Sequence, residues 1–111
     1  MLEQIAAGEI GRYIGRRDCI ILDVRDKAEY EAGHVIGAKL MEVWKLEKLL
    51  GATTGKLREL PEPILVLYCE RGGESLRMAR YLSRRGYQVK NVTGGMKQLR
   101  NHREYLERGR Y

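Results

Sequence analysis

The chain has 111 residues, of which 43% are hydrophobic and 32% are charged. That length suits one domain and is too short for two ordinary ones, so we expect residues 1–111 to form a single domain. The composition excludes a disordered chain, a collagen-like chain and a disulfide-dense scaffold. No apolar run approaches the ~20 residues that span a bilayer, and the first residues show no secretory leader. We therefore expect a cytoplasmic protein with no membrane partner.

Basic residues outnumber acidic ones by 21 to 15, which gives a net charge of +6 and favours acidic partners in general. They are scattered and never run longer than two, so the pattern indicates a basic surface rather than a nucleic-acid site. The two cysteines, Cys19 and Cys69, lie far apart and have no close Cys or His neighbour, so the spacing of zinc ligands is absent. We expect no metal site and, in a reducing compartment, no structural disulfide.

The first half of the chain alternates short apolar runs with segments of helical spacing. The predicted elements are, in order, a strand at 5–6, a helix over 7–14, a buried strand at 19–24, a helix at 27–32 ended by Gly33, a strand at 38–43, a helix at 44–50 ended by Gly51, a loop at 52–55 and a helical turn at 57–60.

The second half contains the clearest elements. They are a doubly buried strand at 64–68, a loop at 70–74, an amphipathic helix at 75–85, a strand at 87–92, a turn at 94–95 and a helix from 96 to about 106. Strands that alternate with helices predict an α/β fold, a parallel sheet with helices on both faces. Ligands of such folds bind where strands end and helices begin, and Cys69 lies at that kind of junction.

The segment around Cys69 has a chemical consequence. Backbone N–H groups at the start of the following helix lack intrahelical partners, and they converge on the sulfur if the loop curls around it. The helix dipole adds positive potential there, so both effects favour thiolate over thiol. Gly72 and Gly73 admit positive φ and let the backbone approach closely. The result is an anion cradle beside a nucleophilic sulfur.

A buried apolar role is the alternative for each cysteine, because Cys is among the most buried residue types. For Cys69 the surrounding strand, glycine loop and helix favour the reactive thiol. Cys19 stands near the start of its strand with no glycine loop after it, so we expect it to be a buried apolar residue.

Three ordered motifs resemble the signature of rhodanese-like domains. They are residues 22–25 (LDVR) followed by 29–38 (EYEAGHVIGA), then 68–69 (YC) with its five-residue loop and helix, and finally 94–96 (GGM). The resemblance runs from about residue 5 to residue 99. It implies a compact α/β domain with a five-stranded, mostly parallel sheet and helices on both faces.

The resemblance also implies a sulfurtransferase. Cys69 would accept a sulfane sulfur from thiosulfate or a persulfide donor and pass it to cyanide, a thiol or a protein acceptor. The substrate-binding loop would consist of Glu70, Arg71, Gly72, Gly73, Glu74 and Ser75. A ring of N–H donors can hold a persulfide anion without a metal, and no organic cofactor is needed.

Other residues of the first motif are expected to support the structure: Asp23, Arg25, Glu29 and His34. An arginine near a buried strand end needs a partner, and we expect Arg25 to pair with Glu29 or Glu31. His34 is expected to be a hydrogen-bonded turn residue rather than a base, because a thiolate held by N–H donors needs no base.

The loop departs from the family pattern at its fifth position. Active members often carry arginine there, whereas this chain has Glu74, and Arg71 is the candidate to supply the cationic charge. Glu70, Arg71 and Glu74 together give the loop a formal charge of −1. A carboxylate near the sulfur opposes a dianionic donor. We therefore expect modest activity with thiosulfate and better activity with a less charged persulfide donor.

Two other functions stay open. The first is a non-catalytic rhodanese-like module that binds or regulates a partner. The second is a cysteine phosphatase or arsenate reductase, whose longer loop ends in an arginine six residues after the cysteine, where this chain has Ser75.

The basic residues near the C-terminus are expected to form a solvated helix face. They are Lys97, Arg100, Arg103, Arg108 and Arg110. Docking of an acidic protein that accepts sulfur is the alternative role for this face.

Overall fold

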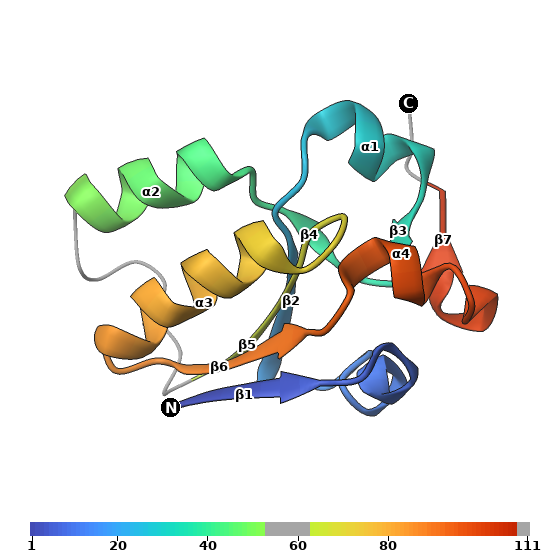
Figure 1. Ribbon diagram of the computed structural model, residues 1–111, viewed down its shortest axis with the longest axis horizontal. Coiled ribbons are helices and arrows are strands. Elements are labelled where there is room, and N and C mark those ends of the chain that lie inside the picture. Colours follow the sequence, from blue (N-terminus) through green and yellow to red (C-terminus); the bar gives the residue numbers. More distant parts are fainter. Residues whose placement is uncertain (53–62, 109–111) are drawn as a thin grey trace.

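The computed structural model describes residues 1–52 and 63–108, and it forms an α/β fold (Figure 1). A five-stranded sheet has the strand order β1-β6-β5-β2-β4, and each neighbouring pair is parallel. The strands are β1 (Leu2–Ile5), β2 (Cys19–Asp23), β4 (Lys39–Leu40), β5 (Ile64–Tyr68) and β6 (Gln88–Val92). The predicted five-stranded parallel α/β class is thereby confirmed.

Helices cover both faces of this sheet (Figure 1). The face with α2 (Val43–Ala52) and α3 (Gly73–Arg84) buries a core that includes Leu46, Met78 and Leu82. The opposite face is covered by the 3₁₀ helix η1 (Ala7–Arg12) and α4 (Gly95–Leu99), with a second core around Ile10, Tyr68 and Leu99. Because β5 contributes residues to both cores, it reads as a continuous apolar run.

A second, two-stranded sheet was not predicted. In it β3 (His34–Val35) pairs antiparallel with β7 (Leu106–Glu107), just after the 3₁₀ helix η3 (Arg103–Tyr105). The predicted helix from 96 to about 106 is therefore wrong beyond Leu99. The chain leaves α4 there so that its last described strand can pair with the segment that follows α1 (Lys27–Ala32).

Several predicted boundaries also differ. The first strand spans Leu2–Ile5 instead of 5–6, the next helix is a 3₁₀ helix, the strand predicted at 38–43 contains only Lys39–Leu40, α2 continues through Gly51 to Ala52, and α3 begins at Gly73 and ends at Arg84. The predicted turn at 57–60 and the loop residues after 52 lie outside the described residues. Lys27–Ala32 and Ile64–Tyr68 match their predictions.

The parallel sheet brings the ends of β2 and β5 to one edge. Asp23 pairs in register with Tyr68, so Val24 and Cys69 leave the sheet side by side. The backbone N–H of Val24 donates to the carbonyl of Tyr68 at 3.1 Å. The candidate site lies at this carboxyl edge. None of the helices in the described ranges has the length and apolar character that crossing a bilayer requires.

Candidate functional site at the carboxyl edge of the sheet

Cys69 lies directly after β5, and its side chain is held by the loop that follows. Its residue is only 6% exposed, yet its sulfur is not surrounded by hydrocarbon alone. The backbone N–H groups of Gly72 and Ser75 donate to Sγ at 3.1 and 3.3 Å. Two converging N–H donors stabilise negative charge on the sulfur.

The loop can turn its amides inward because of Gly72. This residue has φ +99°, in the left-handed region that residues with a Cβ rarely adopt. Its carbonyl accepts hydrogen bonds from the N–H of Leu76 at 3.0 Å and from the hydroxyl of Ser75 at 3.2 Å. Gly73, in contrast, is the first residue of α3 and is not in the left-handed region, so only one of the two predicted glycines needs that freedom.

The start of α4 supports the loop from behind. The N–H groups of Met96 and Lys97 donate to the carbonyls of Cys69 and Glu70 at 2.7 and 2.9 Å. Gly95 makes this approach possible, since a Cβ there would overlap the carbonyl oxygen of Cys69. The GGM motif at 94–96 therefore has a physical role, which is to fasten the cysteine loop to the next element.

A pocket of about 380 Å³ opens over the sulfur. Its lining residues are Val24, Arg25, Glu29, Cys69, Glu70, Arg71, Gly73 and Glu74. Four of the six predicted loop residues therefore line it, while Gly72 and Ser75 contact the sulfur through their backbone N–H groups. Within the described ranges no three His, Cys, Asp or Glu side chains gather closely enough to hold a metal ion.

Both carboxylates of the loop have cationic partners. Arg100 donates from Nη2 to Glu70 Oε1 at 3.0 Å and also bonds Oε2, and Arg25 Nη1 lies 3.7 Å from Oε1. The hydrogen bond from Arg100 is the main cause that lowers the pKa of Glu70. Glu74 is exposed and pairs with Arg77 at 3.3 Å. The negative charge of the loop is thus largely balanced by neighbouring guanidinium groups.

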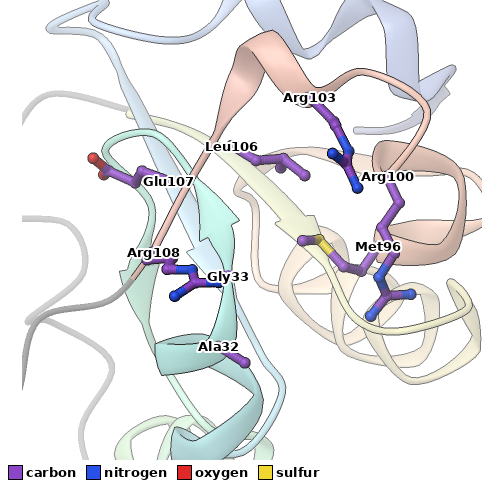
Figure 2. Close-up of a pocket in the computed structure, with 8 residues that line it drawn as sticks. All are labelled: Ala32, Gly33, Met96, Arg100, Arg103, Leu106, Glu107 and Arg108. Carbon is purple, nitrogen blue, oxygen red and sulfur yellow. The ribbon is translucent and has the colours of Figure 1, made fainter.

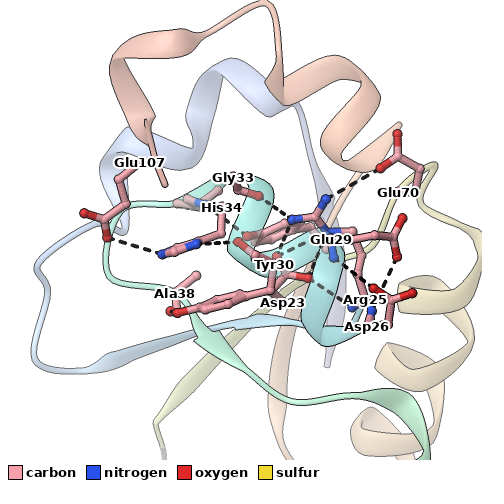
Figure 3. Close-up of polar contacts among 12 residues, drawn as sticks. Asp23, Arg25, Asp26, Glu29, Tyr30, Gly33, His34, Ala38, Glu70 and Glu107 are labelled. Atoms are coloured by element: carbon pink, nitrogen blue, oxygen red, sulfur yellow. Dashed lines mark hydrogen bonds and ion pairs between the residues drawn. The ribbon is translucent and has the colours of Figure 1, made fainter. Parts of the chain in front are cut away.

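Arg25 forms its ion pairs with carboxylates other than the predicted ones. It binds Asp23 with two nitrogens, Nε to Oδ1 at 3.0 Å and Nη2 to Oδ2 at 2.8 Å, and both side chains are almost fully buried (Figure 3). Nη2 also donates to the carbonyl of Gly33 at 2.6 Å, which ties β2 to the end of α1. Glu29 instead closes the amino end of α1 by exchanging hydrogen bonds with Asp26.

His34 is buried and hydrogen-bonded, and it lies in β3 rather than in a turn. Its Nδ1 is 2.8 Å from the carbonyl of Tyr30 and its Nε2 is 3.5 Å from Glu107 (Figure 3). The hydroxyl of Tyr68 accepts a hydrogen bond from the N–H of Val35 at 3.0 Å, and burial is the main cause that raises the pKa of this hydroxyl. These contacts build the support beneath the site.

Cys19 occupies a different environment at the start of β2. Its sulfur lies 3.5 Å from Oδ1 of Asp18, and that carboxylate is held by Arg16 at 2.7 Å. Burial is the main cause that raises the pKa of the Cys19 thiol. No glycine loop brings backbone N–H groups to this sulfur in the part of the chain that the structure describes.

Similarity to known proteins bears on this arrangement. The family model of the rhodanese-like domain matches residues 6–102. A thiosulfate sulfurtransferase GlpE of Coxiella burnetii is 30% identical over 103 residues, which cover 92% of this chain and 91% of that protein. A tRNA uridine(34) hydroxylase of Hamiltonella defensa is also 30% identical, but the match covers 85% of this chain and only 27% of that protein. The crystal structure of a rhodanese-like domain protein from Staphylococcus aureus matches with a TM-score of 0.68 at 24% identity, covering 87% of this chain and 90% of that one.

Proposed function

The chain belongs to the rhodanese-like domain family, and we propose that it is a sulfurtransferase in which Cys69 carries the sulfur as a persulfide. One observation carries this proposal. The sulfur of Cys69 accepts backbone N–H groups from Gly72 and Ser75 at the base of an open pocket. That arrangement stabilises an anionic sulfur and leaves room for a donor beside it.

In the first step the Cys69 thiolate attacks the outer sulfur of the donor. With thiosulfate, a bond forms between Sγ and that sulfur, the S–S bond of thiosulfate breaks, and sulfite leaves with the electron pair. Total charge is conserved, and no external oxidant or reductant is required. The two donated N–H groups then lie against Sγ of the persulfide.

The outer sulfur of the persulfide has donors of its own nearby. The N–H groups of Arg71, Gly73 and Glu74 have no hydrogen-bond partner among the described residues, and these residues line the pocket. The first N–H groups of a helix are free to bind an anion. We expect them to hold the terminal sulfur, which is the atom that the acceptor attacks in the second step.

The ion pairs of the loop bear on the choice of donor. Arg100 and Arg25 balance Glu70, and Arg77 pairs with Glu74, so the cationic side chain of Arg71 lies at the pocket wall beside loop carboxylates that already have partners. This lowers the electrostatic cost of admitting a dianion. Thiosulfate is therefore a workable donor, and a persulfide of lower charge remains the predicted better one.

The phosphatase alternative lacks its guanidinium clamp. The sixth residue after the cysteine is Ser75, whose side chain is buried and bonded to the carbonyl of Gly72. The arginine of the loop, Arg71, is the second residue after the cysteine and not the sixth, where the clamp of those enzymes stands.

Intact mass tests the proposal. Incubation with thiosulfate should add one sulfur, about 32 Da, and cyanide or a reductant should remove it. The Cys69→Ser variant should gain no mass, whereas Cys19→Ser should behave as the parent protein does. Addition of sulfur to the Cys69→Ser variant, or none to the parent with either donor, would contradict the proposal.

A further inference from the structure

A second pocket, of about 430 Å³, lies beside the cysteine loop and is not used by the proposed first step. It is formed where the end of α1, the start of α4 and strand β7 come together (Figure 2). Its apolar lining consists of Ala32, Gly33, Met96 and Leu106. A volume of several hundred cubic ångströms is typical of sites for small ligands.

Three arginines line the same pocket, and two of them have no carboxylate partner in the described ranges. Arg103 and Arg108 form no ion pair there, and Figure 2 shows them on opposite sides of the pocket. Arg100 is paired with Glu70. These residues do not form the single helix face expected from the sequence, since Arg103 begins η3 and Arg108 follows β7.

The one acidic residue of the lining does not neutralise these cations. The carboxylate of Glu107 is directed to His34, at 3.5 Å, and accepts the N–H of Gly37 at 3.2 Å. In Figure 2 it points away from Met96 and Leu106. The pocket therefore combines an apolar floor with unbalanced guanidinium groups, which suits a ligand with a short carbon chain and more than one carboxylate.

Two contacts connect the second pocket with the cysteine loop. Arg100 lines the second pocket and bonds Glu70, which lines the pocket over Cys69. Met96 lines the second pocket as well, and its N–H donates to the carbonyl of Cys69 at 2.7 Å. A small molecule anchored between Arg103 and Arg108 would therefore lie in a pocket that two of its lining residues connect to the cysteine loop.

On the basis of the proposed sulfur transfer, we infer that this pocket binds the carboxylates of a small acidic thiol that accepts the sulfur. The thiolate of that acceptor attacks the outer sulfur of the Cys69 persulfide. A new S–S bond forms on the acceptor, the bond between the outer sulfur and Sγ breaks, and Sγ departs as the thiolate held by Gly72 and Ser75. The product is the persulfide of the acceptor, and no electrons enter or leave the system.

A matched pair of acceptors tests this inference. Mercaptosuccinate carries two carboxylates, and 2-mercaptoethanol carries none. In the Arg103→Gln/Arg108→Gln variant, the ratio of kcat/KM for mercaptosuccinate to that for 2-mercaptoethanol should fall about tenfold. The control is Arg80→Gln/Arg84→Gln, which removes the same charge from exposed positions of α3 and should leave the ratio within about twofold.

A binding measurement separates the pocket from the chemistry. Titration of the Cys69→Ser protein with succinate should show saturable binding, and the Arg103→Gln/Arg108→Gln change should weaken it about tenfold. Absence of succinate binding, or an unchanged acceptor ratio in a protein that still forms its persulfide, would overturn the inference alone. If the Arg103→Gln/Arg108→Gln variant lost transfer to an acidic peptide but not to mercaptosuccinate, the inference would also be overturned, in favour of a protein acceptor. Failure of Cys69 to take up sulfur would instead remove the proposed function.

Discussion

The two cysteines lie at opposite ends of two adjacent strands, and the groups that contact their sulfurs differ in kind. Cys19 opens β2 and Cys69 follows β5, two strands that pair in parallel. The Cys69 sulfur accepts two backbone N–H groups, whereas the Cys19 sulfur contacts the carboxylate of Asp18. One environment stabilises a sulfur anion and the other opposes it.

The difference follows from the direction of the strands rather than from exposure. At the carboxyl edge a strand leads into a helix, whose first N–H groups face back toward the strand end. At the amino edge the chain arrives from a turn, and no helix begins after the cysteine. We therefore expect the more buried of the two sulfurs, that of Cys69, to be the better nucleophile.

Replacing each cysteine in turn tests the difference between the two sulfurs most directly. Cys69→Ser should lower sulfur transfer from thiosulfate to cyanide by at least about 1,000-fold, because the covalent carrier is lost. Cys19→Ser should keep the parent rate within about twofold. Steady-state assays of both variants check this, and comparable losses in the two would mean that neither sulfur is the carrier.

The two ends of β2 also offer a buried and an exposed ion pair of the same type. Arg25→Gln should destabilise the fold by about 3–5 kcal/mol, because it leaves Asp23 buried without its cation. Arg16→Gln, which breaks the exposed pair with Asp18, should cause no measurable loss. Urea denaturation of both variants provides the measurement. Equal losses of stability in the two variants would show that burial does not decide how much these ion pairs contribute to the free energy of unfolding.

Two glycines with positive φ extend the same comparison. Gly95→Ala should cost about 2–3 kcal/mol and lower activity, since the new methyl group would push against the carbonyl of Cys69. Gly15→Ala, in the turn before β2, meets no atom within 4 Å and should cost only about 1 kcal/mol through its backbone conformation. Thermal unfolding and transfer rates report both effects. An activity loss in Gly15→Ala as large as that in Gly95→Ala would contradict the role given to the contact.

The elements with the strongest local sequence patterns could be predicted from the sequence, and so could the candidate site cysteine. The apolar run of Ile64–Tyr68 and the helical spacing after it identified the centre of the fold, and the glycine loop between them pointed to Cys69. The ion pair of Arg25 with Asp23 had a signal that was missed. The side chain of an aspartate at the end of a strand commonly accepts the backbone N–H two residues on, and here that bond brings Arg25 to Asp23.

Contacts between distant segments left no such signal. Arg100 pairs with Glu70 across 30 positions of sequence, and only the folded arrangement of α4 against the cysteine loop brings them together. The two-residue strands β3 and β7 could not be predicted from the sequence either, since their pairing with each other, rather than local propensity, makes them strands. The arginine-lined pocket depends on that pairing, which is why the basic residues were expected to form a helix face.

Competitive alkylation within one molecule tests the central claim, that backbone amides make Cys69 a site for anionic sulfur. Burial raises the pKa of Cys19, so its thiolate fraction is small at pH 7 and grows only as pH rises toward that pKa. With iodoacetamide at pH 7 and peptide mass mapping, Cys69 should be labelled at least about tenfold faster than Cys19, although it is the more buried of the two. Labelling of Cys19 as fast as Cys69, or faster, would contradict the account.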